Sequence, residues 1–416
     1  MRHISGWWLV KVVMLCALGW AVAACRQPAS NAQETSDAVT TFLQRHWQFP
    51  VPLQGAPPES YSDLEASLHP QECGICHPQQ LQDWQTSLHS RSMGPGIYGQ
   101  LVEMESDPAT YTFCATCHTP LQEQIPFVER DATYQPNPKF DKTLQHAGLV
   151  CAACHVRQHQ RFGPPRRPEL PAIPPGTQLP HGGFTVSPAY QQSAFCKPCH
   201  QFEPDGFGLN GKLLENTYEE WRQSRYAAEG QTCQACHMPD RRHLWRGIHD
   251  PEMVRAAMTV KVEPNVASYA PGGQMRTAIS VTNSGAGHYF PTYVTPKLFI
   301  RAQLLDAQGK VIDATAQETV IGREVTLNLS EEVYDTRIPP DGSHTVEYEQ
   351  VVPTGAATLR VRIVVHPDHF YRRFFEAMLQ DGGGKGREQL QDALRRAEAS
   401  PFTAFEQEIA LQKRNE

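Results

Sequence analysis

The chain has 416 residues, of which 40% are hydrophobic and 19% are charged, and its formal net charge is −7 at pH 7. Its 34 prolines and 29 glycines indicate many loops, and this profile excludes a coiled coil, a collagen-like fibre and a polytopic membrane protein. Aromatic residues reach 9%, which disfavours a disordered chain. Because no lysine- or arginine-rich block is present, we do not expect nucleic acid as a ligand.

The N-terminal segment has the pattern of an export signal. A positive flank with Arg2 and Lys11 comes before an apolar stretch over residues 12–24, which ends in small residues. The four residues that end at Cys25 resemble the lipobox of bacterial lipoproteins, in which the cysteine carries the lipid. An ordinary secretory signal and a short membrane anchor are the alternatives, although the stretch is short for a transmembrane helix.

We therefore expect residues 1–24 to be a lipoprotein signal peptide and Cys25 to be lipidated. Residues 25–60, rich in Gln, Ser, Ala and Pro, are expected to tether the lipid to the folded part. The mature protein would be exported and lipid-anchored on the periplasmic side. Arg26 stands where an inner-membrane retention signal usually has Asp, which favours the outer membrane over the inner membrane.

Ten of the twelve cysteines fall into five copies of the pattern Cys-x-x-Cys-His between residues 73 and 237. The first cysteines of successive copies are 41, 37, 45 and 37 residues apart, an approximate internal repeat. The five copies are Cys73-Cys76-His77, Cys114-Cys117-His118, Cys151-Cys154-His155, Cys196-Cys199-His200 and Cys233-Cys236-His237.

This pattern is typical of covalent haem attachment. The two thiols add to the two vinyl groups of haem, and the histidine that follows them binds the iron as the proximal ligand. A single copy could be a zinc or redox site, and disulfides would leave the five histidines unexplained. Five copies in an exported chain predict five covalently attached haem c groups, which would form much of the core of this region.

The sixth position of each iron decides function. A second histidine gives a low-spin electron carrier, whereas an open position can bind a small molecule. The sequence contains more than enough further histidines to fill all five positions. The candidates for the distal ligand are His89, His249, His243, His146, His159, His181 and His288.

His288 lies outside the motif region, in a glycine-flanked turn over residues 283–292. The turn could present the imidazole to a haem from a second domain. Alternatively, its neighbours Tyr289 and Phe290 simply fill the interface between the domains. Ligation by His288 would lock the two domains together.

Four features resemble the multihaem c-type cytochrome family related to the tetrahaem electron carrier of ammonia oxidisers. They are the motif array with Trp84-x-x-Ser87-x-His89, the run over residues 193–196, the Cys233 motif followed by Met-Pro, and the turn over residues 287–292. The resemblance covers about residues 60–300. It implies stacked and perpendicular haem pairs, mostly bis-histidine ligation with His89 and His288 as distal ligands, and electron transfer across the periplasm or outer membrane.

Two details modify this resemblance. A second Trp221-x-x-Ser224 element has Tyr226 where the first element has His89, so it supplies no equivalent imidazole. No Cys-x-x-Cys-Lys motif is present, which argues against the lysine-ligated catalytic haem of pentahaem nitrite reductases.

The C-terminal third has a different character, with no cysteine and alternating apolar and polar residues. Seven strands within residues 258–367 predict an immunoglobulin-like β-sandwich that caps the mostly α and loop cytochrome domain of residues 61–257. Residues 368–416 are expected to form a helical tail. The predicted strands are 258–266, 275–282, 297–305, 311–319, 324–329, 344–352 and 358–365.

Three functions follow from the ligation alternatives. The first is a pentahaem electron carrier that works between redox-partner proteins, either other cytochromes or membrane quinol-oxidising complexes. The second is an oxidoreductase in which one open-site haem acts on a small nitrogen or sulfur compound, with His243 or Arg241 stabilising charge. The third is a subunit of a haem filament or an outer-membrane conduit. The abundance of histidines favours the carrier.

Overall fold

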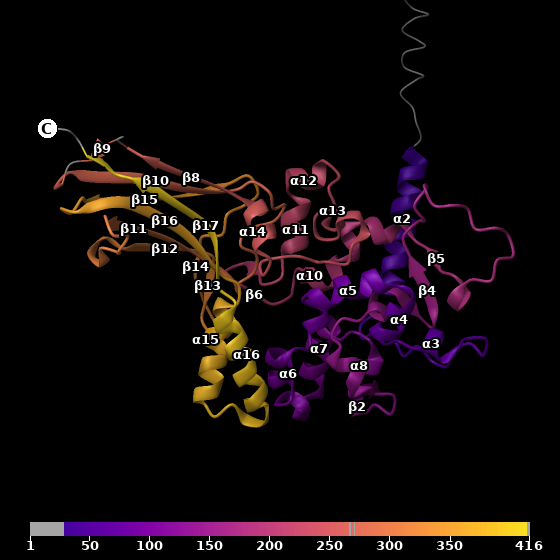
Figure 1. The fold of residues 1–416 in the computed structure, drawn as a ribbon. Helices are drawn as coiled ribbons and strands as arrows, with labels where there is room; N and C mark the ends of the chain where they lie inside the picture. The colour runs from indigo at the N-terminus through magenta and orange to yellow at the C-terminus, as the bar shows by residue number, and fades with distance from the viewer. Residues whose placement is uncertain (1–28, 266–267, 270, 414–416) are drawn as a thin grey trace, which may run out of the picture. The chain divides into compact units, whose positions relative to one another are not determined.

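The computed structural model describes residues 29–265, 268–269 and 271–413 (Figure 1). The predicted signal peptide and Cys25 lie outside these residues. The chain divides into two compact units, residues 1–46 and residues 47–416. Helix α2 (Ala29–His46) is the described part of the first unit. Within the described ranges, no helix combines the length and the apolar character needed to span a membrane.

The predicted boundary of the tether at residue 60 is wrong, because residues 47–60 belong to the second unit. Val51 is fully buried in a small apolar cluster, and its backbone N–H donates to the carbonyl of Pro120 at 2.8 Å. The rings of Trp47 and Phe49 stack with centres 5.7 Å apart. These large apolar side chains explain why the segment packs where the prolines alone suggested a linker.

The region that carries the five motifs, residues 47–257, consists of short helices and loops, as expected, together with short strands that form the small sheets β1-β2, β3-β4-β5 and β6-β7. Its apolar clusters are small. Prolines at the first helical position start many of the helices, since that position needs no N–H donor. The helices are α3 (Asp63–Ala66), α4 (Pro70–Cys76), α5 (Pro78–Thr86), α6 (Pro95–Leu101), α7 (Pro108–His118), α8 (Lys142–His146), α9 (Cys151–His155), α10 (Lys197–His200), α11 (Thr217–Arg222), α12 (Arg225–Ala228), α13 (Cys233–His237) and α14 (Pro251–Ala257).

Two antiparallel sheets form the C-terminal half and pack face to face. The first has the strand order β15-β10-β8 and the second β12-β11-β16-β17 (Figure 1). Along β16, Leu359, Val361, Ile363 and Val365 are fully buried and alternate with more exposed residues, which is the period of a half-buried strand. The strands are β8 (Met258–Pro264), β10 (Gln274–Asn283), β11 (Lys297–Asp306), β12 (Gln317–Ile321), β15 (Ser343–Val351), β16 (Ala356–His366) and β17 (Phe402–Ala410).

The predicted helical tail is wrong at its end. Helices α15 (His369–Gln380) and α16 (Arg387–Ala399) form as expected, but the chain then returns as β17 and pairs with β16. Two cross-strand ion pairs, Arg360 with Glu408 and Arg362 with Glu406, hold this strand in register. The charged residues of β17 thus face the partner strand's arginines, and their polarity disguised the strand in the sequence.

The predicted strand over residues 324–329 also needs correction, because it is not part of the sandwich sheets. Instead, β13 (Arg323–Val325) and β14 (Glu332–Asp335) form a separate hairpin. This hairpin lies against another small hairpin in the motif region, β6 (Gly208–Leu209) and β7 (Lys212–Leu213). It therefore works as a connector between the two regions.

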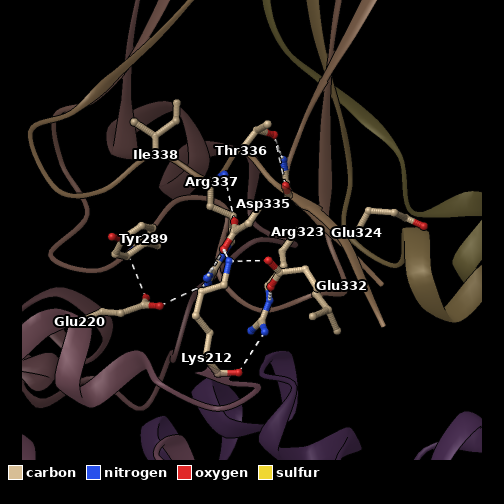
Figure 2. A network of polar contacts seen from close by, with 12 residues as sticks. Lys212, Glu220, Tyr289, Arg323, Glu324, Glu332, Asp335, Thr336, Arg337 and Ile338 are labelled. Atoms are coloured by element: carbon tan, nitrogen blue, oxygen red, sulfur yellow. Dashed lines mark hydrogen bonds and ion pairs between the residues drawn. The ribbon is translucent and has the colours of Figure 1, made fainter. Parts of the chain in front are cut away.

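A buried polar network joins these two hairpins (Figure 2). Arg323 is fully buried and pairs with Glu332 at 2.8 Å. It also donates to three backbone carbonyls, those of Leu209 at 3.1 Å, Lys212 at 3.0 Å and Leu213 at 2.8 Å. The Lys212 ammonium also contacts Glu332, at 2.6 Å. Since these donors and acceptors satisfy one another, the sandwich is fastened to the motif region and not merely tethered to it.

We predict that Arg323→Met destabilises the protein by about 3–5 kcal/mol, because it leaves Glu332 and three carbonyls of the hairpin without their buried partner. The measurement is the free energy of unfolding in urea. Arg301→Met is the control: Arg301 pairs with Glu318 on an exposed face, where we expect a loss of about 0–1 kcal/mol. Equal losses in the two variants would contradict the role of Arg323.

Candidate functional site

The five motif histidines lie at or directly after the C-terminal ends of short helices. In three of them Nδ1 faces a backbone carbonyl: Ser92 for His118 at 2.7 Å, Phe162 for His155 at 2.8 Å and Arg246 for His237 at 2.6 Å. In His200, Nδ1 faces the hydroxyl of Tyr293 at 2.9 Å. A nitrogen that faces a carbonyl must carry the proton, so Nε2 of His118, His155 and His237 is left as a free electron-pair donor.

Three of these histidines have a second imidazole opposite them. The ring centres are 6.3 Å apart for His200 and His89, 6.2 Å for His155 and His243, and 6.3 Å for His237 and His288. A metal-bound imidazole nitrogen lies about 2 Å from the metal and the ring centre about 1 Å further, so two rings on opposite faces of one metal have centres about 6 Å apart. All three spacings fit one metal ion between the rings.

Two of the three imidazoles that lie opposite a motif histidine are oriented in the same way. Nδ1 of His243 faces the carbonyl of Arg241 at 3.1 Å, and Nδ1 of His288 faces that of Tyr289 at 3.0 Å. Nδ1 of His89 is buried without a partner among the described residues. Burial lowers the pKa of His89 to about 3 and the pKa of His155 and His200 to about 4. The rings are therefore neutral near pH 7, as metal ligation requires.

His181 is held close to His77, the proximal residue of the first motif. The pKa of His77 is lowered by burial and then by the charge of His181, which places the two rings within electrostatic reach. The loop of His181 is fixed from two sides: Tyr61 donates to its carbonyl at 2.7 Å, and Glu65 accepts from its N–H at 2.6 Å. Nδ1 of His181 faces Gly183 at 2.8 Å, so this ring too directs Nε2 outward.

His118 differs from the other four. Among the described residues, no imidazole stands opposite it, and the pKa of His118 is lowered by burial with no second histidine involved. His146, a predicted distal ligand, is exposed on α8, where its ring contacts Tyr98 at 4.6 Å. The second motif is thus the one to which the structure assigns no second histidine.

Two further predicted ligands, His159 and His249, are not brought to a motif histidine. Nε2 of His159 faces the carbonyl of Gly55 at 3.2 Å, and Nε2 of His249 lies 3.0 Å from the carboxylate of Asp368. The nitrogen that would bind iron is engaged in both. The structure therefore does not place His159, His249 or the exposed His146 as second imidazoles, although the sequence made all three candidates for the distal ligand.

The ten motif cysteines all lie in the described part of the chain and form no disulfide, and motifs distant in sequence adjoin one another. A side-chain hydrogen bond with Cys151 lowers the pKa of Cys73, and in the same way Cys199 lowers the pKa of Cys117 and Cys196 that of Cys233. The first motif therefore adjoins the third, and the fourth adjoins both the second and the fifth. A pair of imidazoles that face each other beside neighbouring thiols differs from a structural zinc site, in which the donors surround the metal as a tetrahedron.

Sequence reasoning missed several acidic residues and a tyrosine of this region. Asp83 and Glu220 bond to the segments that carry His243 and His288. Glu215 is buried beside Cys117 and Tyr293, and burial raises its pKa to about 8. Asp83 and Glu220 each directly precede the tryptophan of the Trp-x-x-Ser element, which is the signal that could have found them. Glu215 and Tyr293 carry no such signal.

The fold is similar to that of a pentahaem cytochrome. The structure of a pentahaem cytochrome c552 from Thermochromatium tepidum aligns with a TM-score of 0.59 at 17% sequence identity and covers 84% of this chain and 100% of that chain. At this identity the likeness concerns the fold alone. Human F-spondin's reeler domain aligns over 26% of this chain with a TM-score of 0.14, which is too weak to carry an argument. No family model and no curated protein matches the sequence.

We predict that Glu215 makes stability depend on pH. Its folded pKa of about 8 is above its usual value of 4.5, so the folded state binds more protons than the unfolded state between these values. The unfolding free energy should therefore fall as pH rises from about 5 to 8, by about 2–4 kcal/mol more than in Glu215→Gln. Urea unfolding at pH 5, 6.5 and 8 measures this difference. Parallel curves for the two proteins would contradict it.

Proposed function

We propose that this protein is an exported pentahaem c-type cytochrome that relays electrons between redox partners through mostly bis-histidine haems. The observation that carries the proposal is the set of three facing imidazole pairs, each with one histidine from a Cys-x-x-Cys-His motif. The similarity of fold to a pentahaem cytochrome supports it. We also propose that the sandwich is of the immunoglobulin-like kind.

In this function, the residues of the chain would bind the haems and keep other ligands away from the irons. The ten thiols would attach each haem at two points, and the proximal nitrogen would come from the motif histidines His77, His118, His155, His200 and His237. His89, His243, His288 and His181 would occupy the distal side and keep other ligands away. A haem iron held in this way supplies one-electron chemistry without binding substrate. The adjoining thiols order the attachment sites as first beside third, and second beside fourth beside fifth.

A second function is favoured by one observation: among the residues that the structure describes, no imidazole lies opposite His118. A haem on the second motif would keep an open position for a small nitrogen or sulfur compound. Glu215 lies beside Cys117, and Tyr371 of α15 lies beside Glu215 and Cys114. Buried protonated groups at this position could supply protons to a bound molecule. They replace His243 and Arg241 in that role, since His243 faces His155.

The cellular setting remains a proposal based on the sequence. The lipobox at Cys25 supports a lipid anchor, and Arg26 supports the outer membrane. Other cytochromes or quinol-oxidising complexes would be the partners. The filament or conduit hypothesis gains no supporting observation from the described residues.

We predict four low-spin haems and one high-spin haem in electron paramagnetic resonance spectra of the oxidised protein, with cyanide binding to one haem per chain. His243→Ala should convert one further haem to the high-spin state, whereas His146→Ala, which removes an exposed ring, should leave the spectrum unchanged. Five low-spin haems without cyanide binding would remove the second function. Fewer than three low-spin haems would contradict the carrier.

A further inference from the structure

An acidic residue, a tryptophan and a serine recur at the same spacing in two places. The copies are Asp83-Trp84-Gln-Thr-Ser87 and Glu220-Trp221-Arg-Gln-Ser224, on α5 and α11. In both, the serine hydroxyl donates to the tryptophan carbonyl at 2.7 Å and closes the end of the helix. The two copies therefore share their local structure, although only the first continues to a histidine.

The tryptophans make the same long-range contact. Trp84 donates its indole N–H to the carbonyl of Leu149 at 2.8 Å, and Trp221 donates to that of Gln231 at 2.8 Å. Each acceptor stands two residues before the first cysteine of a motif, the third motif for Leu149 and the fifth motif for Gln231. Each tryptophan thereby fixes the chain that enters one motif.

The acidic residue of the first copy holds the segment of a distal histidine. The carboxylate of Asp83 receives two hydrogen bonds from Arg242, at 2.6 and 2.7 Å, and one from the backbone N–H of His243, at 3.0 Å. The Asp83 side chain is only 3% exposed, and Arg242 lowers its pKa. The loop that it holds contains Asp240, Arg241 and Trp245 in the left-handed backbone region, a conformation that needs outside support.

Glu220 plays the equivalent part in the second copy (Figure 2). One of its carboxylate oxygens accepts the backbone N–H of Tyr289, directly after His288, at 3.0 Å, and the other pairs with Arg337 at 3.2 Å. The side chains of Glu220 and Arg337 are 5% and 6% exposed. Arg337 is fixed in turn by a two-point contact with Asp335 at 2.9 and 3.0 Å.

The two contacts of each copy lead to the same pair of imidazoles. Trp84 supports the third motif, whose His155 faces His243, the residue that Asp83 holds. The second copy does the same for the fifth motif and its pair, His237 and His288. We propose that each acid-Trp-x-x-Ser element is a clamp that positions both axial histidines of one haem, with Asp83 and Glu220 as the positioning residues on the distal side.

This inference rests on the proposed function and adds to it separate roles for the tryptophan and the carboxylate of each element. The tryptophan contact sets the proximal side, and the carboxylate with its arginine sets the distal side. A buried, doubly bonded carboxylate has little freedom, so the imidazole beside it keeps one orientation. The first element also leads into His89, which faces His200 of the fourth motif. Only at the third and fifth motifs do a tryptophan contact and a carboxylate contact of one element lead to the same pair, which makes these two motifs the test cases.

The test uses the haem-loaded protein with Asp83→Asn and Glu220→Gln. An amide keeps the size of the side chain and an acceptor for the backbone N–H, but it loses the charge that attracts the arginine. We expect one low-spin paramagnetic resonance signal to shift in each variant, a different signal in the two. Because loss of such support weakens a metal ligand about 10- to 100-fold, cyanide should compete at that haem with its apparent Kd lowered by the same factor.

Three further variants make the outcome decisive. His243→Ala and His288→Ala identify the signals that belong to each pair, and Glu219→Gln is the matched control, since Glu219 is the neighbour of Glu220 and makes an exposed pair with Arg222. If Asp83→Asn fails to fold, Arg242→Gln tests the same contact from its more exposed side.

The results separate this inference from the proposed function. If the alanine variants change no haem signal, the ligand assignment itself is wrong. If they do, but the amide variants keep native spectra and native cyanide affinity, the clamp is overturned. Loss of thermal stability with native spectra would also overturn it, because the carboxylates would then only hold the fold together.

Discussion

The separation of about 6.3 Å between facing imidazoles governs much of this structure. Two neutral rings must be kept apart at a fixed distance, yet each must be buried and aimed at the other. Carbonyl groups on Nδ1 set the direction of most rings, and burial keeps them uncharged. Neither requirement calls for long helices, so the motif region can consist of short turns, as long as each turn is bonded to something rigid.

Each motif histidine faces or contacts residues that are distant from it in the sequence. His89 lies just after the first motif but faces His200 of the fourth, and His243 follows the fifth motif but faces His155 of the third. One stretch of the sandwich side, residues 288–293, serves two motifs at once: His288 faces His237, and the hydroxyl of Tyr293 contacts His200. The sandwich side therefore contributes residues to two of the candidate sites and is more than a cap.

Sequence reasoning identified what depends on local pattern. Most strands follow from alternation, and the five motifs follow from fixed spacing. Among the predicted distal ligands, the structure brings His89, His243 and His288 opposite motif histidines, while haem attachment itself stays a prediction. It failed where a side chain's role depends on distant partners. His146, His159 and His249 are near motifs in sequence, but an exposed position or an engaged Nε2 removes them. Strand β17 was hidden because its glutamates are paired only with arginines of β16.

The position of β17 has a consequence for the order of assembly. Chains are made from the N-terminus, so the motif cysteines are complete before the sandwich exists. The sheet that backs the sandwich core closes only when residues 402–410 join it, at the end of the chain. His288 belongs to that late part, whereas His237 belongs to the early part. Under the proposed function, the fifth site would thus pass through a stage with a single axial histidine during biogenesis, and this stage would last until the sandwich has folded.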